Sequence, residues 1–388
     1  MNRTALTERH RALGAKMTDF HGWEMPLYYT SIIEEHRAVR EALGLFDISH
    51  MGQVLVTGPD ATRTLNAILT SDIEQVAEGR ACYTLMLNES GGVLDDLIVY
   101  RTGREAFLII VNCANRTSDV QWLTAHRQGR ATVSDISEGR SIIAVQGPRA
   151  CRTLEQVLDA RVTSLGRFGM APIRTMGPDA CLARTGYTGG DGFELFLPDH
   201  HARRVWDLVL TASQPLGGLP IGLGARDTLR IEAGLRLYGS DMETTTSPFE
   251  AELSWTVALN KPDFIGKDAL LAQKARGVTR KFVGVEFGQG PIPRPGCDFL
   301  VEERPVGRVT SGTFSPILNK ALGMGYVEAG MAKPGTELAI MVRAKRYPGT
   351  IVKLPFWKPE AKPAMLGPTA SPTPSLGAGR AALEDRTR

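Results

Sequence analysis

The segment CYTLMLNESGGVLDDLIVYRTGREAFLIIVN, residues 82–112, contains three apolar runs and no helical pattern between them. We predict strands at 82–87, 93–101 and 106–112, because aliphatic and aromatic residues dominate each run. The connections NESGG and TGRE are rich in turn-forming residues. The segment therefore predicts three consecutive strands joined by short turns.

Helices and further strands are predicted on both sides of this segment. The stretch GLFDISHMGQVLVTG before it is predicted to be one strand, because MGQVLVTG alternates, and ATRTLNAILTSDI, with Asp60 at its start, indicates a helix. After it come a predicted helix at 117–126 and a strand in ATVSDI. The order strand–helix–strands–helix–strand, around residues 52–137, is typical of a ferredoxin-like split unit and predicts the α+β class.

The chain changes character twice towards its C-terminus. From about residue 281, short strands such as KFVGVEF and VGRVTSGTF are separated by Gly and Pro, which favours an all-β barrel or sandwich. We place this β domain at 276–358, after a larger region at 1–275. Residues 359–388 are rich in Pro, Ala, Ser and Gly, and this composition predicts a disordered tail.

Composition excludes several classes of function. The 388 residues are 43% apolar and 22% charged with a net charge of +3, as in a soluble globular protein without a nucleic-acid or membrane partner. The five cysteines form no CxxC, which favours a reducing cytosol over disulfides or a zinc site. The N-terminus lacks the apolar core of a signal peptide, so a cytoplasmic location is expected. Neither GxGxxG nor GxxxxGK[ST] occurs.

Two adjacent acids open the central strand of the segment. Side chains alternate along a strand, so Asp95 points to one face and Asp96 to the other, with Ile98 and Tyr100. One acid can then meet solvent or cap the turn while the other faces a cavity. Burying a carboxylate among apolar residues is costly unless it is paired or functional. The pattern alone also fits two ordinary turn aspartates.

The stretch ARTGYTGGDGFELFLP, residues 183–198, contains a second candidate. Glu194 is the only charge in its strand. It is either an edge residue that meets water or a carboxylate that accepts two parallel hydrogen bonds from a ligand.

The third candidate lies in GLGARDTLRIEAGLRLYG, residues 222–239. Arg226 stands where a helix begins, and it suits a ligand or a structural ion pair equally well. Glu232 and Arg236, four residues apart, are expected to form a surface pair on this helix.

These stretches, together with GWEMPLYY, IIEEHRAVREALGLFDISHMG, DFIGKDAL and VTSGTFSPILNKALGMGYV, closely resemble the aminomethyltransferase family, the T proteins of the glycine cleavage system. The resemblance runs from about residue 5 to residue 357. It implies three domains around a central channel that holds tetrahydrofolate as co-substrate, with a C-terminal β-barrel and no metal, pyridoxal phosphate or flavin. The implied partner is a lipoylated H protein that carries an aminomethyl group. The implied products are ammonia, 5,10-methylenetetrahydrofolate and the dihydrolipoyl arm.

The resemblance also implies roles for individual residues. Asp96 matches the catalytic aspartate, and Asp95 is expected to be a turn or supporting residue. Glu194 matches the residue that holds the pterin edge. The other implied folate-site residues are Tyr83, Asn112, Tyr187, Arg226 and Met51. At the C-terminus the resemblance supports only a loose assignment of a folate contact to Arg343 or Trp357.

Two related functions remain as alternatives. Folate-dependent demethylases use the same pocket with a small methylated donor. A non-catalytic folate-binding helper typically carries KGCYxGQE, whereas this chain has KPDFIGKDAL at the matching place, with neither the Cys nor the GQE.

Overall fold

A five-stranded sheet forms around the segment 82–112 in the computed structural model, which describes residues 1–158, 162–288, 290–343 and 345–359. Its strands lie in the order β5-β6-β7-β4-β8, and each neighbouring pair is antiparallel. The strands are β4 (Gly52–Thr57), β5 (Arg80–Leu87), β6 (Val93–Gly103), β7 (Ala106–Val111) and β8 (Thr132–Asp135). The helices α3 (Ala61–Ile68) and α4 (Arg116–Ala125) complete this unit. It is the predicted ferredoxin-like arrangement with one additional strand between the two helices.

The two faces of this sheet have different neighbours. Leu97 and Val99 of β6 pack in one core with Leu65 of α3 and Leu123 of α4. Tyr100 of β6, on the opposite face, belongs to a second core that also contains residues of another sheet. Alternation along β6 thus directs successive side chains into two different environments.

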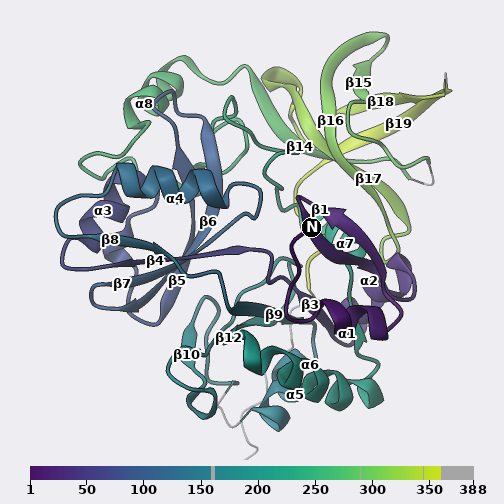
Figure 1. Cartoon of the computed structure of the whole chain (residues 1–388). Helices are drawn as coiled ribbons and strands as arrows, with labels where there is room; N and C mark the ends of the chain where they lie inside the picture. Colours follow the sequence, from purple (N-terminus) through teal and green to yellow (C-terminus); the bar gives the residue numbers. More distant parts are fainter. Residues whose placement is uncertain (159–161, 289, 344, 360–388) are drawn as a thin grey trace, which may run out of the picture. The chain divides into compact units, whose positions relative to one another are not determined.

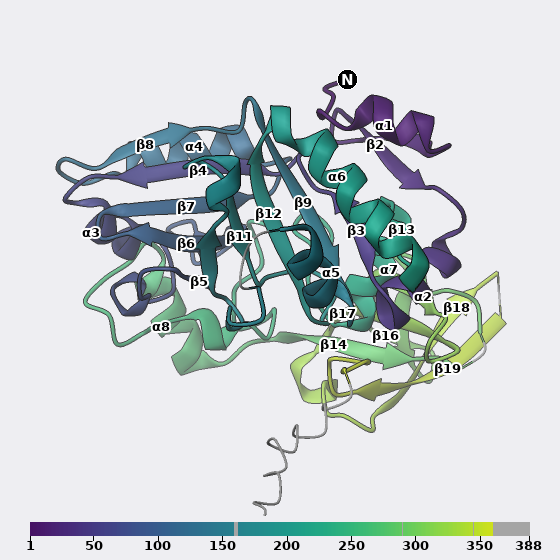
Figure 2. The same cartoon turned by 90° about the horizontal axis from the view of Figure 1, so that it is seen from below.

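The second sheet has six strands in the order β10-β11-β12-β9-β3-β13. Its strands are β3 (Gly44–Asp47), β9 (Arg140–Gln146), β10 (Met170–Pro172), β11 (Cys181–Ala183), β12 (Gly192–Pro198) and β13 (Leu219–Pro220). Helices α5 (Ala150–Val157) and α6 (Asp199–Ser213) pack against one of its faces (Figure 2). Phe46, Ile142 and Phe196 on the other face pack with Tyr100 of the five-stranded sheet. The two sheets therefore face each other across a shared apolar layer.

The stretch GLFDISHMGQVLVTG, predicted as one strand, forms two strands in different sheets. β3 ends at Asp47 in the six-stranded sheet, and β4 begins at Gly52 in the five-stranded sheet. The intervening residues, which include Met51, cross from one sheet to the other. The single-strand prediction was wrong here, because alternation in MGQVLVTG does not show which sheet a strand joins.

The remaining N-terminal and central elements lie beside the two sheets (Figure 1). They are α1 (Thr7–Ala12), the hairpin β1 (Lys16–Phe20) and β2 (Trp23–Tyr28), α2 (Ile32–Glu41), α7 (Leu223–Glu232) and α8 (Lys267–Arg276). Short 3₁₀ helices occur at Ile73–Gln75, Arg174–Met176, Gln214–Leu216, Ser254–Thr256 and Ala329–Met331. Ser31 caps α2 by accepting a hydrogen bond from Glu34 N, which explains why this helix starts where it does.

The C-terminal strands close into a six-stranded barrel in the order β14-β17-β16-β15-β18-β19 (Figure 1). They are β14 (Arg280–Glu286), β15 (Asp298–Val301), β16 (Arg304–Ser315), β17 (Lys320–Glu328), β18 (Glu337–Val342) and β19 (Lys345–Val352). Its interior is a core of its own with Val285, Phe299 and Ile340. The α+β class with a C-terminal barrel is thus confirmed. The predicted tail at 359–388 lies, from residue 360, outside the described residues.

In the part of the chain that the structure describes, no helix combines the length and the apolar composition that crossing a bilayer requires.

Candidate active site

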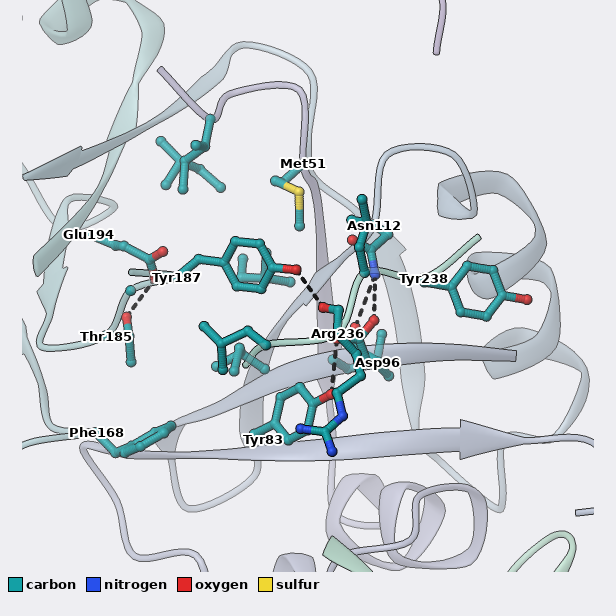
Figure 3. A pocket seen from close by; sticks show the side chains of 18 of the residues that line it. Met51, Tyr83, Asp96, Asn112, Phe168, Thr185, Tyr187, Glu194, Arg236 and Tyr238 are labelled. Carbon is teal, nitrogen blue, oxygen red and sulfur yellow. Dashed lines mark hydrogen bonds between the residues drawn. The ribbon is translucent and has the colours of Figure 1, made fainter. Parts of the chain in front are cut away.

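A cavity of about 370 Å³ lies between the two sheets. Its lining includes seven residues that the resemblance assigned to the site: Met51, Tyr83, Asp96, Asn112, Tyr187, Glu194 and Arg226. Figure 3 labels all of these except Arg226. These residues are far apart in sequence, and they come together because the two sheets pack face to face. The volume is in the range of sites for small molecules and cofactors.

Glycines shape the two turns that deliver acids to the cavity. A Cβ on Gly92, just before β6, would lie 1.8 Å from Thr244 O, so only glycine permits this close approach. Gly189, just before β12, has φ +74°, and a Cβ there would lie 2.6 Å from Ala233 Cβ. The glycines of GGVLDD and TGGDG therefore place β6 and β12 at the cavity.

Asp96 is held at both carboxylate oxygens. Tyr83 donates its hydroxyl to Oδ2 at 3.0 Å, and Asn112 Nδ2 donates to Oδ1 at 3.0 Å (Figure 3). Burial and the negative charge of Asp95 raise the pKa of Asp96 to about 7, while the bonds from Tyr83 and Asn112 oppose that rise. A carboxyl with a pKa near neutrality can take up and release a proton under physiological conditions.

Asp95 points to the opposite face of β6, as the alternation predicted. It does not meet solvent, however, because its exposure is 0%. Asn112 and Asn115 donate hydrogen bonds to it from beside α4. Two roles were expected for this acid, a turn residue or a supporting residue. Its contact with Asn112, which also bonds Asp96, fits the supporting role.

Glu194 is also held by hydroxyl groups. Thr185 Oγ1 donates to its Oε2 at 2.5 Å, and Tyr100 OH donates to the same oxygen at 3.2 Å. Burial raises the pKa of Glu194, and Thr185, Arg226 and Tyr100 oppose the rise. Within the described residues no donor is bonded to Oε1 of Glu194, so this oxygen is available to a ligand.

Arg226, on α7, lies with its guanidinium 4.6 Å from the ring centroid of Tyr187. Within the described residues it forms no ion pair with Glu194 or with another carboxylate, so the structural ion pair considered from the sequence is absent there. A second hollow of about 330 Å³ shares Tyr187, Arg226 and Leu237 with the first. Arg226 thus presents a cation where the two hollows adjoin.

The structure adds residues to the cavity that the sequence did not single out. Trp255 is 69% exposed and stacks on Tyr83, with ring centroids 5.6 Å apart. Arg236 and Tyr238 line the cavity beside Asp96 (Figure 3). Phe168 lines the cavity with φ +58°, a left-handed conformation that is strained for a bulky residue. A sequence signal is absent for these positions, because irregular connections carry no periodicity.

The expected surface pair between Glu232 and Arg236 was wrong. Glu232 is not on the surface with Arg236: its side chain is fully buried and bonded to Arg40 Nε at 2.9 Å. Arg236 instead donates to the carbonyls of Ala251 and Gly234. A spacing of four places two residues on one helix face but does not tell which face is buried.

The loosely assigned C-terminal residues do not line the cavity. Trp357 stacks on Arg40, whose guanidinium carbon lies 3.6 Å from the ring centroid. Arg343 belongs to the turn between β18 and β19 in the barrel and is not part of either hollow.

Comparison with known proteins agrees with this architecture. Residues 6–261 match the family model of the GCVT N-terminal domain, and residues 280–358 match that of the glycine cleavage T-protein C-terminal barrel domain. The aminomethyltransferase of Halothermothrix orenii is 44% identical over 356 residues, covering 92% of this chain and 100% of the relative. That of Shouchella clausii is 45% identical over 358 residues, covering 92% and 98%.

A solved structure has the same fold over almost the whole chain. The crystal structure of glycine cleavage system aminomethyltransferase T from Bartonella henselae superposes with a TM-score of 0.87 at 34% sequence identity, covering 92% of this chain and 98% of that one. Family models, curated relatives and solved structure agree over both the sheet region and the barrel. The chain belongs to the aminomethyltransferase family, the T proteins of the glycine cleavage system.

Proposed function

We propose that this chain transfers the methylene carbon of an aminomethyl group, carried on the lipoyl arm of an H protein, to tetrahydrofolate. The products are 5,10-methylenetetrahydrofolate, ammonia and the dihydrolipoyl arm. The observation that supports this most strongly is the placement of Asp96, a buried carboxyl with a pKa raised to about 7, in the same apolar cavity as Glu194. The two acids have different hydrogen-bond partners within one cavity. This arrangement suits a catalytic role for one acid and a binding role for the other.

The cavity fits a reduced folate. A pterin is a flat ring with an amino group and an adjacent ring N–H, and Oε1 of Glu194 is open to such donors. Thr185 and Tyr100 already occupy Oε2, so the ligand's donors meet Oε1 first. Ile98, Ile142 and Phe196 supply apolar walls for the ring. Arg226 adds a positive charge to the same cavity, and this charge acts on Glu194.

Asp96 is assigned the proton transfer and the charge stabilisation. Tetrahydrofolate supplies two nitrogens, N5 and N10, that receive the carbon. Asp96 orients N10 and accepts its proton, and its negative charge favours the cation that forms as ammonia leaves. Such help from a positioned group is typically worth ~10²–10⁴ in rate.

Tyr83 and Trp255 shield this acid. The Tyr83 hydroxyl is bonded to Asp96, and the Trp255 ring covers the Tyr83 ring at the rim. Burial and the negative charge of Asp96 keep the pKa of Tyr83 well above its usual value, so the phenol remains a donor. Holding Asp96 in one orientation supplies the positioning that the reaction needs.

The test is a comparison of one-carbon donors. The purified chain is supplied with tetrahydrofolate and, in turn, aminomethyl-loaded lipoylated H protein, the unlipoylated H protein, and small methylated amines such as sarcosine and dimethylglycine. Formation of 5,10-methylenetetrahydrofolate is followed. We expect turnover with the loaded lipoyl arm only. Turnover with a methylated amine at an equal or higher rate would replace this function with that of a demethylase, and no turnover with any donor would favour the folate-binding helper.

A further inference from the structure

A group of polar side chains is buried directly behind Asp96, between β6 and α4. Asp95 has 0% exposure and Asp119 has 2%, although acids are rarely buried so completely. Asn112 follows β7, and Asn115 and Asp119 lie at the start of α4. The reaction proposed above uses none of these acids, so their burial needs another explanation.

Asn112 connects this group to the cavity. Its amide nitrogen donates to Asp95 Oδ1 at 2.8 Å and to Asp96 Oδ1 at 3.0 Å. An amide nitrogen carries two hydrogens, and here Asp95 Oδ1, Asp96 Oδ1 and, at 3.3 Å, the Asp96 carbonyl oxygen share them. The position of the Asp96 carboxylate is therefore linked to that of Asp95 through one side chain.

Asp95 is surrounded by donors. Asn112 N donates to Oδ2 at 3.0 Å, and Asn112 Nδ2 and Asn115 Nδ2 each donate to Oδ1 at 2.8 Å. Three N–H groups directed at one carboxyl favour its ionised form. Asn115 makes this bond instead of capping its own helix, since no side-chain cap is formed at α4.

Asp119 lacks such donors. Its Oδ2 is buried, and within the described residues no N–H or O–H group donates to it. Its carboxyl shares a hydrogen bond with Asp95. Two carboxyls can share a hydrogen bond only if one of them holds a proton. The donor count assigns the proton to Asp119 and the negative charge to Asp95.

We propose that, for the reaction proposed above, Asp95 and Asp119 are positioning residues: a buried acid pair with one proton that orients Asp96 through Asn112 and sets the charge that Asp96 carries. Asp119 donates to Asp95 and keeps it anionic. The Asp95 anion then holds Asn112 and repels negative charge on Asp96. The cavity acid is thereby both fixed in place and kept available for protonation.

Other groups near Asp96 keep one charge state around neutral pH. The titratable and charged groups that face it are Tyr83 on β5, Asp95 on β6, Asp119 on α4, Arg226 on α7, Tyr187 before β12, and Arg236 and Tyr238 after α7. Burial raises the pKa of Tyr83, of Tyr187 and, to about 12, of Tyr238, so these phenols stay neutral. The arginines stay cationic. The tyrosines and arginines therefore do not change charge near neutral pH, and only the carboxyls of Asp95, Asp96 and Asp119 remain to be assigned a charge.

Burial raises the pKa of Asp95, and the hydrogen bonds from Asp119, Asn112 and Asn115 oppose that rise. Burial and the charge of Asp95 raise the pKa of Asp119 to about 10, which keeps it protonated at neutral pH. After burial itself, the charge of Asp95 is the main cause of the raised pKa of Asp96.

The first test measures the ionisation of Asp96 without any substrate. Aspartate residues are labelled with ¹³C at the carboxyl carbon, and the Asp96 signal is assigned by its loss in Asp96→Asn. We expect a midpoint near pH 7 in the wild type and a midpoint at least about one unit lower in Asp95→Asn, because the neighbouring anion is gone. An unchanged midpoint in Asp95→Asn would overturn the proposal. This readout is independent of turnover, so a shifted midpoint in a chain without transferase activity would reject the proposed function and keep the acid pair.

The second test uses two replacements of Asp119. Asn is close in shape to a protonated Asp and donates to Asp95, whereas Leu has similar size and donates nothing. We expect turnover of Asp119→Asn within about three-fold of wild type and a loss of about ten-fold or more in kcat for Asp119→Leu, with the KM for tetrahydrofolate little changed. The Asp119→Asn pH–rate profile should keep the wild-type midpoint. Equal damage from both variants at equal melting temperature would show that Asp119 is not a neutral donor, and the proposal would fail.

Discussion

The buried carboxyl of Asp96 lowers the stability of the folded chain at neutral and alkaline pH. Its pKa is near 4 in an unfolded chain and about 7 in the folded one, first because of burial and then because of Asp95. The folded state therefore holds the proton more tightly. The stability gained from this proton is complete below about pH 4 and is lost as the pH rises through about 7.

Asp96→Asn should therefore stabilise the chain in a pH-dependent way. The amide resembles the protonated acid and does not ionise, so we expect the mutant to melt only slightly higher than the wild type at pH 5, where most of the stability from the proton is retained. At pH 8 the mutant should melt a few degrees higher. Thermal unfolding at both pH values measures this, with Asp179→Asn, at an exposed position, as the control. A melting-temperature difference that is the same at both pH values would contradict the raised pKa.

Glu194→Gln should weaken folate binding more than it slows chemistry. The amide replaces one acceptor oxygen by a donor, either towards the ligand or towards Thr185 and Tyr100, which already donate to this side chain. Loss of a charge-assisted hydrogen bond costs roughly 1.5–3 kcal/mol, which is about one to two decades in affinity. Titration calorimetry with tetrahydrofolate measures the change. Unchanged affinity would show that Glu194 is structural and that the pterin lies elsewhere.

Some of these residues could be predicted from the sequence and others could not. Glu194 is the only charge in its strand, Asp96 is one of two adjacent acids at the start of another, and alternation gives the face of each. The partners of Asp95 lie at the start of a helix, where Asn and Asp are common for reasons of capping alone. Trp255 lies in a connection without periodicity. The residues that complete the site could thus not be predicted, because the local sequence pattern at their positions does not determine their contacts.

At the scale of elements, one lysine fixes the end of helix α3. Lys261 is 3% exposed, and its ammonium donates to the carbonyls of Asn66 at 2.7 Å, Leu69 at 2.5 Å and Ser71 at 3.0 Å. The last carbonyls of a helix have no partner within it and carry a partial negative charge. The segment after the sheet region thus returns to cap a helix of the five-stranded unit.

Lys261→Met should destabilise the chain at this contact. Met fills a similar volume but leaves the three buried carbonyls without their donor, so we expect a loss of about 2 kcal/mol or more in the free energy of unfolding. Denaturant unfolding measures it, with the exposed Lys274→Met on α8 as the matched control. A loss no larger than that of the control would show that the ammonium is dispensable and that solvent replaces it.

The order of strands was more predictable than their assignment to sheets. The three strands of residues 82–112 and the helices beside them form as the periodicity predicts. The two strands at Gly44–Asp47 and Gly52–Thr57 were predicted as one, because the crossing at Ile48–Met51 depends on contacts with distant strands. Local sequence determines an element, and long-range pairing determines which sheet it joins.

In the molecule as a whole, a buried carboxylate connects the barrel to the sheet region. Glu232 of α7 accepts hydrogen bonds from Arg40 of α2 and from Ser315 of barrel strand β16. His36 Nε2 lies 3.0 Å from the same carboxylate, and Trp357 N donates to the Glu232 carbonyl at 3.0 Å. One side chain therefore joins three parts of the chain that are far apart in sequence.

Glu232→Ala should destabilise the chain strongly. The Arg40 side chain is 3% exposed and would remain as a buried charge without its partner, and breaking a buried pair in this way typically costs 3–5 kcal/mol. Glu252→Ala is the control, because its pair with Lys281 is 45% and 41% exposed and should be worth less than about 1 kcal/mol. Thermal and denaturant unfolding measure both variants. Equal losses would contradict the role of Glu232 in joining the barrel.

The central claim is that Asp96 is the acid of a folate-dependent transferase site between two sheets. The most direct measurement is single-turnover formation of 5,10-methylenetetrahydrofolate by Asp96→Asn, from aminomethyl-loaded H protein, together with the affinity of the same variant for tetrahydrofolate. We expect a rate lower by about 10²-fold or more with an affinity within about three-fold of wild type. A rate within a few-fold of wild type, at equal affinity, would contradict it.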